Sequence, residues 1–136
     1  MALSPRLRDA VDALELRPGM RVLEVGGAPG AAAREVTRRI GEGFVLVVDR
    51  SPKGVELTRR ACADEIAAGV LEVRQVAVED ARLEPGEAPY DLAFACRVGV
   101  LDGRHPQRRD DALASLRAML VEGAPILIDP TTSTRS

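Results

Sequence analysis

The chain has 136 residues, a length typical of one compact domain. Hydrophobic residues make up 46% of the sequence but aromatic residues only 2%, so we expect a core of valine, leucine, isoleucine and alanine. The net charge of -2 and the scarcity of aromatic rings argue against a nucleic-acid-binding protein, which presents a basic surface and rings that stack on bases.

The sequence shows no sign of a membrane or secreted protein. No apolar run reaches the length of a membrane span, and charged residues occupy the N-terminus, where a signal peptide is apolar. Cys62 and Cys96 follow no zinc or redox spacing, so we expect two reduced, buried thiols and no metal site. These features predict a soluble, cytoplasmic protein with no membrane partner.

Predicted helices and strands alternate along the chain. Ser4 and Pro5 are typical of a helix start, and an apolar stripe continues this helix to Leu16, before a turn at 17–19. Apolar runs between turn residues predict strands at 22–25, 44–48, 71–78, 90–96 and 126–128. Helical patterns predict helices at 31–40, 52–69 and 110–121. We therefore expect an α/β domain over residues 1–130, with a parallel sheet between helices, and a polar, disordered tail over 131–136.

A strand, a glycine turn and a helix follow one another at the start of this domain. Gly26, Gly27 and Gly30 carry no side chain, so a ligand can lie against the backbone and meet the free N–H groups of the helix start. In a parallel sheet, ligands bind at this end of the strands. Glu24 ends a buried apolar strand and needs a partner, which is either the ligand or nearby backbone N–H groups.

Two further acidic positions follow the second and third strands. Asp49 lies about 20 residues after the glycine turn, where a carboxylate can accept hydrogen bonds from both hydroxyls of a ribose. The alternative is that Asp49 caps the helix that begins near Pro52. Glu79 and Asp80 are either contacts for an adenine amino group or a solvated strand end. The expected ligand is a nucleoside with a group that extends into the glycine turn.

Four segments resemble the motifs of the class I S-adenosylmethionine-dependent methyltransferases, in order and in spacing. Residues 22–30 resemble the first motif, in which an acid precedes a Gly-x-Gly-x-Gly turn, and residues 47–52 resemble the second. Residues 75–80 correspond to the adenine-contacting motif, and residues 90–96 to the fourth strand. The resemblance implies a Rossmann-like parallel sheet of about five strands in the order 3-2-1-4-5. It also implies S-adenosylmethionine as cofactor, with S-adenosylhomocysteine as its product.

The resemblance further implies where each part of the cofactor lies. The glycine turn would approach the methionine part, with Glu24 near its amino group. Asp49 would hold the ribose, Val78 and Glu79 the adenine, and two residues after the fourth strand would lie near the sulfonium. The expected cofactor-binding residues are Glu24, Gly26, Gly27, Gly30, Asp49, Arg50, Val78, Glu79, Cys96 and Arg97.

The chain departs from the family pattern in three places. Ala28 occupies the middle glycine position of the turn, and Ala77 occupies the position of the usual acid in the third strand, for which Glu79 is the substitute. The chain also stops after the fifth strand, whereas family members usually add two more strands. The strand at 126–128, flanked by prolines, would then lie at an exposed edge. We expect a second copy of the chain to cover this edge, which predicts a homodimer.

Methyl transfer requires alignment of the reactants, with removal of a proton where the acceptor carries one. Asp102 and His105, in the loop after the fourth strand, are candidates for a general base, and the alternative for His105 is a solvated loop residue. The loop lacks an Asn-Pro-Pro-Tyr-type sequence, which argues against adenine and glutamine nitrogens as acceptors. We therefore expect a small-molecule acceptor.

Two other functions stay open. The first is a non-catalytic module of the same fold, which binds a cofactor or a partner protein. The second is a NAD(P)-binding domain, in which Arg50 would meet a 2′-phosphate. Ala28 and Ala31 count against this second function, because they replace two glycines of the dinucleotide motif.

Overall fold

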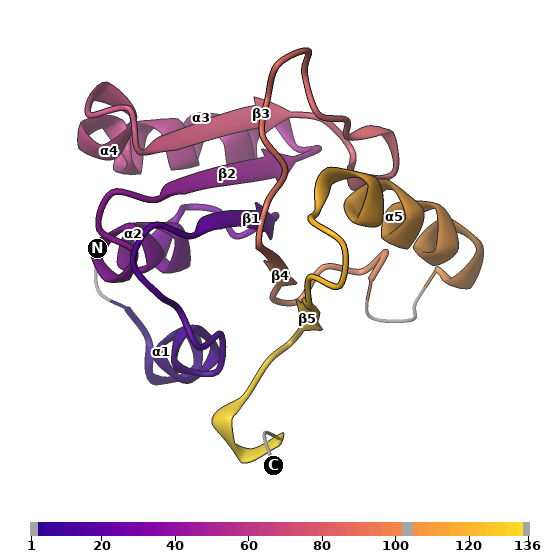
Figure 1. Cartoon of the computed structure of the whole chain (residues 1–136), viewed down its shortest axis with the longest axis horizontal. Helices are drawn as coiled ribbons and strands as arrows, with labels where there is room; N and C mark the ends of the chain where they lie inside the picture. The colour runs from indigo at the N-terminus through magenta and orange to yellow at the C-terminus, as the bar shows by residue number, and fades with distance from the viewer. Residues whose placement is uncertain (1–2, 102–104, 135–136) are drawn as a thin grey trace.

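The computed structural model describes residues 3–101 and 105–134 and shows a parallel sheet between layers of helices (Figure 1). The sheet has five strands in the order β3-β2-β1-β4-β5, and all neighbouring strands are parallel. This order confirms the Rossmann-like prediction. The strands are β1 (Arg21–Val25), β2 (Phe44–Asp49), β3 (Leu71–Gln75), β4 (Leu92–Ala95) and β5 (Ile126–Ile128).

Helices cover both faces of the sheet, as predicted. The helices are α1 (Pro5–Asp12), α2 (Ala31–Arg39), α3 (Pro52–Ala61), α4 (Ala63–Ala67) and α5 (Pro106–Met119), and η1 (Val78–Asp80) is a short 3-10 helix. Val22 of β1 faces the layer of α1, α2 and α3, whereas its neighbour Leu23 faces α5 and η1. The central strands are therefore buried on both faces, which explains their continuous apolar runs.

Three helices differ in length from their predictions. The first helix ends at Asp12 instead of Leu16, because Glu15 has a φ of 56°, a left-handed conformation that cannot continue a helix. The helix predicted over 52–69 is divided into α3 and α4 at Cys62, whose φ of -103° and ψ of 22° depart from helical values. The last helix begins at Pro106 instead of residue 110, since proline is favoured at the first helical position.

Two strands are shorter than predicted. β3 ends at Gln75 instead of Val78, because its neighbour β2 ends at Asp49, which is paired with Gln75. The chain then turns into η1. β4 begins at Leu92 instead of Tyr90, and Tyr90 forms an isolated parallel bridge with Leu120.

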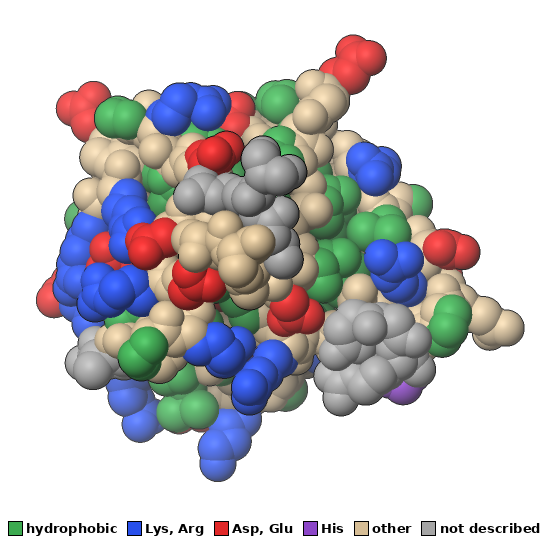
Figure 2. Space-filling view, turned by 90° about the horizontal axis from the view of Figure 1, so that it is seen from below, with side chains coloured by type: hydrophobic (Ala, Val, Ile, Leu, Met, Phe, Trp, Pro, Cys, Tyr) green, Lys and Arg blue, Asp and Glu red, His purple; other side chains and the backbone are tan. Residues whose placement is uncertain are grey.

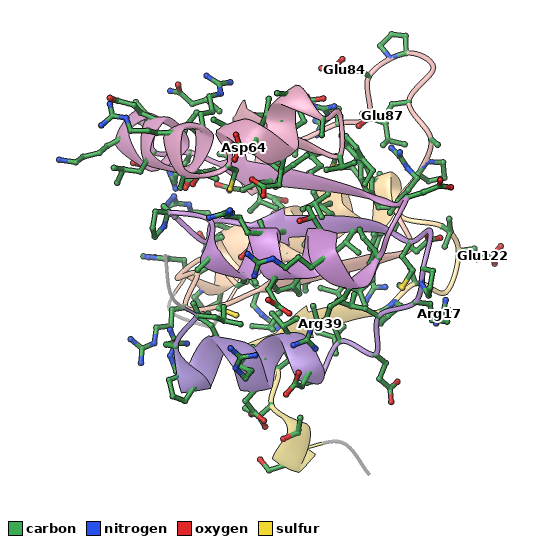
Figure 3. All side chains as sticks on the ribbon, turned by 90° about the vertical axis from the view of Figure 1, so that its left-hand side faces the viewer. Arg17, Arg39, Asp64, Glu84, Glu87 and Glu122 are labelled. Atoms are coloured by element: carbon green, nitrogen blue, oxygen red, sulfur yellow. The ribbon has the colours of Figure 1, made fainter. Side chains whose placement is uncertain are left out.

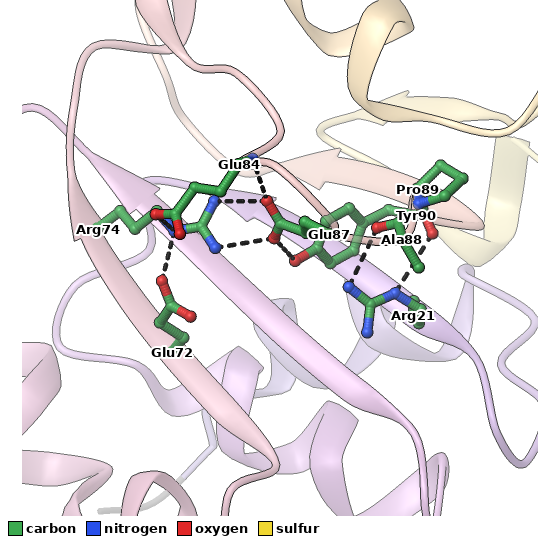
Figure 4. Close-up of polar contacts among 8 residues, drawn as sticks. All are labelled: Arg21, Glu72, Arg74, Glu84, Glu87, Ala88, Pro89 and Tyr90. Carbon is green, nitrogen blue, oxygen red and sulfur yellow. Dashed lines mark hydrogen bonds and ion pairs between the residues drawn. The ribbon is translucent and has the colours of Figure 1, made fainter.

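The connection from η1 to β4 contains no further helix in residues 81–91, and side chains attach it to the sheet. Glu87 accepts two hydrogen bonds from the Arg74 guanidinium, of 3.0 and 2.8 Å, and one of 2.6 Å from the Tyr90 hydroxyl (Figure 4). The Arg21 guanidinium lies 4.5 Å from the centroid of the Tyr90 ring. Glu84 and Glu87 lie on this loop at the edge of the molecule farthest from α1 (Figure 3).

The C-terminal segment contacts α1. Thr132, in η2 (Thr132–Thr134), donates hydrogen bonds from its backbone N–H and its hydroxyl to the Asp9 carboxylate. The predicted disorder of the tail is therefore wrong for this segment, because Asp9 provides an acceptor for it. Arg39 of α2 points toward α1 and pairs with Asp12 at 2.6 Å (Figure 3). Among the described residues, no helix has the length and apolar character to cross a membrane.

Candidate active site

A glycine turn connects β1 to α2 at the carboxyl end of the sheet. Gly27 and Gly30 have φ values of 90° and 104°, which side-chain-bearing residues rarely adopt. A Cβ on Gly30 would lie 2.7 Å from the Cys62 sulfur. Gly26 donates its N–H to the Val48 carbonyl at 2.8 Å, which holds the turn against the end of β2. The turn, packed against Cys62 at Gly30, lies at the place where the sequence predicts a ligand.

Glu24 lies directly below this turn. Its side chain is only 1% exposed, and neither carboxylate oxygen has a hydrogen-bond partner among the described residues. A Cβ on Gly27 would lie 2.1 Å from Glu24 Oε2, so only glycine allows this approach. Burial, and then the charge of Asp49, raises the pKa of Glu24 to about 8. The alternative partner, local backbone N–H groups, is not found among the described residues, so the buried carboxyl group has no hydrogen-bond partner there.

Asp49 ends β2 and lies on the other side of the turn. Its Oδ1 accepts a hydrogen bond of 3.0 Å from the Ser51 N–H. Ser51, not Asp49, is the N-cap of α3, since its hydroxyl accepts the Gly54 N–H at 3.0 Å. A Cβ on Gly54 would lie 2.5 Å from Asp49 Oδ2, so glycine at this position makes room for the carboxylate.

A narrow cavity of about 60 Å³ lies between the glycine turn and η1. Valine side chains form most of its walls, and charged groups from the ends of β2 and η1 complete them. Glu79 Oε1 is buried without a hydrogen-bond partner in the described chain, while Oε2 lies 3.6 Å from Arg108 Nε. The lining residues are Val25, Gly26, Val48, Asp49, Arg50, Val76, Val78, Glu79, Val98 and Val100. We call this space the valine cavity.

The segment after β4 narrows the valine cavity from one side. Val98 and Val100 line it, and a Cβ on Gly26 would lie 3.1 Å from Val98 Cγ2. At about 60 Å³ the valine cavity is therefore small.

Five of the predicted cofactor-binding residues line the valine cavity, namely Gly26, Asp49, Arg50, Val78 and Glu79, whereas Glu24, Gly27, Gly30, Cys96 and Arg97 do not. Cys96 and Arg97 line a second cavity of about 320 Å³, at the carboxyl ends of β4 and β5. The Cys96 thiol has its pKa raised to about 11 by burial and by the nearby Glu24 and Asp129 carboxylates, against the opposing charge of Arg6. At neutral pH this thiol is protonated, so it is not a reactive thiolate.

The two candidates for a general base have different outcomes. Asp102 lies outside the described residues. His105 is exposed at the N-cap of α5 and lines a separate depression with Pro106, Gln107 and Arg108. It lines neither of the two cavities. No cluster of three or more histidine, cysteine, aspartate or glutamate residues suited to a metal ion occurs within 3–101 and 105–134.

The site also contains residues that the sequence analysis does not select. Val98 and Val100 alternate after β4, and this alternation is a local signal for one buried face. Gly54, in the first turn of α3, is recognisable only once Asp49 is placed beside it. Arg6 and Asp129 have no local signal, since opposite ends of the chain bring them to the second cavity.

Comparisons with known proteins identify the family of this chain. A family model described as a methyltransferase domain matches residues 22–123. The chain is 32% identical over 115 residues to a ubiquinone/menaquinone biosynthesis C-methyltransferase of Bordetella avium, covering 83% of this chain and 41% of that protein. It is 48% identical over 50 residues to a protein-L-isoaspartate O-methyltransferase of Methanothrix thermoacetophila, covering 36% of this chain and 24% of that protein.

A solved structure shows the same fold. The SAM-dependent methyltransferase of Thiobacillus denitrificans, crystallised with S-adenosyl-L-homocysteine, superimposes with a TM-score of 0.70 at 21% identity, covering 93% of this chain and 48% of that chain. This chain thus spans less than half the length of these relatives. The matched family model covers most of the chain, including the glycine turn and most or all of β1, β2, β3 and β4. The chain therefore belongs to the methyltransferase domain family, with the fold of the S-adenosylmethionine-dependent methyltransferases.

Proposed function

We propose that this protein binds S-adenosylmethionine at the carboxyl ends of β1 and β2 and transfers its methyl group to a small-molecule acceptor. The buried, unpartnered Glu24 carboxyl group carries the proposal, since a fold rarely leaves such a group without a function. The ammonium group of the cofactor's methionine part carries a positive charge and donates hydrogen bonds, both of which the Glu24 carboxylate lacks in the described chain.

The residues present fit such a cofactor. The turn at Gly26 and Gly27 would present backbone without side chains to the methionine part, and Glu24 lies beside Gly27. Asp49 has a second oxygen beside Gly54 for the ribose hydroxyls. The apolar walls of the valine cavity, with Glu79 at the rim, suit an adenine ring. When bound, the cofactor supplies a methyl group already activated on a sulfonium, and the protein contributes orientation and exclusion of water.

Calorimetric titration with S-adenosylhomocysteine and with NADP tests the proposal. We expect S-adenosylhomocysteine to bind and NADP not to bind. Glu24→Gln should weaken the first ligand at least about tenfold, because a hydrogen bond to a charged group contributes about 1.5–3 kcal/mol. Asp49→Asn should weaken it in the same direction. Asp64→Asn, on the exposed part of α4, is the matched control and should change nothing.

A methyl-transfer assay separates an enzyme from a non-catalytic module of the same fold. Radiolabelled S-adenosylmethionine is incubated with a panel of small acids, phenols and amines. Labelled product that disappears in Asp49→Asn supports the enzyme. Cofactor binding without transfer to any acceptor supports the module. Binding of NADP in place of S-adenosylhomocysteine contradicts the proposal.

We further propose a homodimer in the cytoplasm. The outer edge of β5 has no strand partner in the described chain, and Ile126, Leu127 and Ile128 are only half-buried. Hydrophobic side chains are visible on this side of the molecule, between the C-terminal segment and α5 (Figure 2). A second copy would shield this edge. The two free cysteines are compatible with a reducing compartment.

A further inference from the structure

The second cavity is built from segments that are far apart in the sequence. It lies where β4 and β5 end, and α1 and the C-terminal segment form its other walls (Figure 1). Its lining residues are Arg6, Cys96, Arg97, Asp129, Pro130 and Thr131, and its volume is about 320 Å³. Cys96 is close enough to both Glu24 and Arg6 for their charges to act on its thiol. The cavity is therefore a neighbour of the Glu24 site.

Two guanidinium groups are available in this cavity. The side chains of Arg6 and Arg97 make no hydrogen bond or ion pair with any residue of the described chain. By contrast, Arg39 and Arg74 each pair with carboxylates. Asp129 is the acidic residue of the lining, and its Oδ1 accepts the Arg97 backbone N–H at 2.7 Å. Two cations against one anion leave the cavity with a net positive charge.

The backbone that carries these groups is strained on both sides of the cavity. Arg97 and Asp129 have φ values of 57° and 48°, in the left-handed region that side-chain-bearing residues rarely occupy. The hydrogen bond from Arg97 to Asp129 joins the ends of β4 and β5 in this conformation. Such strain persists only where surrounding contacts fix it, and it is concentrated at binding sites.

Contacts between α1 and the C-terminal segment fix the wall of the second cavity that these two segments form. Thr132 hydrogen bonds to Asp9 attach the C-terminal segment to α1, one helical turn from Arg6. The Arg39 pair with Asp12 fixes α1 to α2. These contacts therefore fix the backbone segments that carry Arg6 and Arg97. This order before binding lowers the entropy lost when a ligand binds.

We infer that this Arg6–Arg97 cavity binds the anionic group, a carboxylate or a phosphate, of the methyl acceptor. The inference rests on the proposed function, because it assigns the second reactant to the space beside the cofactor. Guanidinium groups match carboxylate and phosphate oxygens in a bidentate geometry, and two of them from different elements fix the orientation of the bound molecule. A neutral acceptor of the same shape would leave both cations without a partner.

Benzoate and its neutral analogue benzamide test this inference in NMR titrations of the full chain, with and without S-adenosylhomocysteine. Benzoate should shift the signals of the two arginine side chains, and benzamide should not. Arg6→Gln and Arg97→Gln should each weaken benzoate at least tenfold. Asp129→Asn, which keeps the acceptor oxygen but removes the negative charge, should strengthen benzoate severalfold. Arg8→Gln, an exposed position elsewhere on α1, is the matched control.

Two results would overturn the inference. One is equal benzoate affinity in the wild type, Arg6→Gln and Arg97→Gln. The other is a loss of S-adenosylhomocysteine affinity in Arg6→Gln, which would assign the arginine to the cofactor's own carboxylate. A wild type that fails to bind S-adenosylhomocysteine but binds benzoate through Arg6 contradicts the proposed function and leaves the anion site intact.

Discussion

Glu24 is the residue at which the needs of folding and of binding conflict most directly. A carboxyl group in an apolar interior is stable when protonated and costly when ionised. With a pKa of about 8, it carries its proton at neutral pH in the absence of a ligand. Binding of a cationic ammonium would reverse this preference, so cofactor binding and release of a proton are expected to be coupled.

Glu24→Gln is expected to remove a pH dependence of stability. Burial raises the pKa of Glu24 from 4.5 to about 8, so its stabilising effect is complete below pH 4.5 and is lost as pH rises toward 8. In this interval the wild type should lose up to ~1.4 kcal/mol of unfolding free energy per pH unit. Urea unfolding at pH 5.5 and 7.5, followed by circular dichroism, measures the difference. Equal pH dependence in both proteins would contradict the assigned burial.

Some of these residues were predictable and others were not. An acid within an apolar strand, as at Glu24, is visible in the sequence because it breaks the pattern of its neighbours. Asp49 is visible because it ends a continuous apolar run. Arg6 and Asp129 are separated by most of the chain, and only the folded sheet brings them to one cavity. No local sequence pattern predicts that Arg6 and Asp129 line the same cavity.

At the scale of elements, the glycine turn is defined by what lies beneath it. Gly27 needs both a left-handed conformation and the absence of a side chain, because the Glu24 carboxyl group occupies the space. Gly86 has a similar φ, 82° against 90°, but nothing within 4 Å of a Cβ. A comparison of substitutions at Gly27 and Gly86 therefore separates the cost of the left-handed conformation from the cost of steric overlap.

Gly27→Ala is expected to destabilise the protein much more than Gly86→Ala. The conformational penalty alone is about 1–2 kcal/mol, which applies at both positions. Gly27→Ala adds the overlap with Glu24 and should cost about 3 kcal/mol or more in total. Thermal and urea unfolding of the two variants give the comparison. Similar losses of stability in the two variants would show that the Glu24 side chain moves freely, which would contradict its enclosed position.

The connection between β3 and β4 is the second element with an unusual construction. A crossover between parallel strands usually contains a helix, whereas here η1 and an extended loop perform it. Glu87 holds the loop through Arg74, Tyr90 and the Glu84 N–H (Figure 4). Burial opposes ionisation of Glu87, but these hydrogen bonds prevail and lower its pKa to about 2.

Glu87→Gln should cost about 2–3 kcal/mol of stability at pH 7, because it replaces a bidentate acceptor whose side chain is only 10% exposed. The lowered pKa means that the stabilisation is complete above pH 4.5 and is lost as pH falls toward 2. Acid unfolding of the variant should therefore be shallower than that of the wild type. Glu84→Gln, with a side chain that is 67% exposed, is the control and should have little effect.

The alternation of strands and helices predicts a parallel sheet, and the resemblance to the methyltransferase family predicts the order of its strands. Neither predicts the lengths of the elements. Val76 and Val78 continue the apolar pattern of β3, yet the strand ends earlier because its partner β2 has ended. The predicted helix begins at residue 110, although Pro106 also suits the first position of a helix. The strand propensity of a segment does not indicate where the neighbouring strand ends.

At the scale of the whole molecule, β5 forms one of the two edges of the sheet, and no described strand pairs with its outer side. This chain spans less than half of the length of its methyltransferase relatives, which therefore have further residues that can cover the corresponding edge. In this chain, Pro125 and Pro130 flank the strand and limit unwanted pairing. A second copy is the proposed cover.

Light scattering at micromolar concentration should give twice the 14.5 kDa mass of the chain. Ile126→Lys places a charge on the half-buried edge strand and should yield a folded monomer. Leu57→Lys, at a 39% exposed position on α3, should remain dimeric. A wild-type mass of one chain would refute the homodimer.

The attachment of Thr132 to Asp9 has a consequence for synthesis in the cell. α1 emerges from the ribosome more than a hundred residues before η2, its partner in the fold. The wall between them therefore forms only after η2 has been synthesised. A nascent chain that already contains β1, β2 and β3 still lacks the second cavity, so the proposed acceptor site forms later than the strands of the proposed cofactor site.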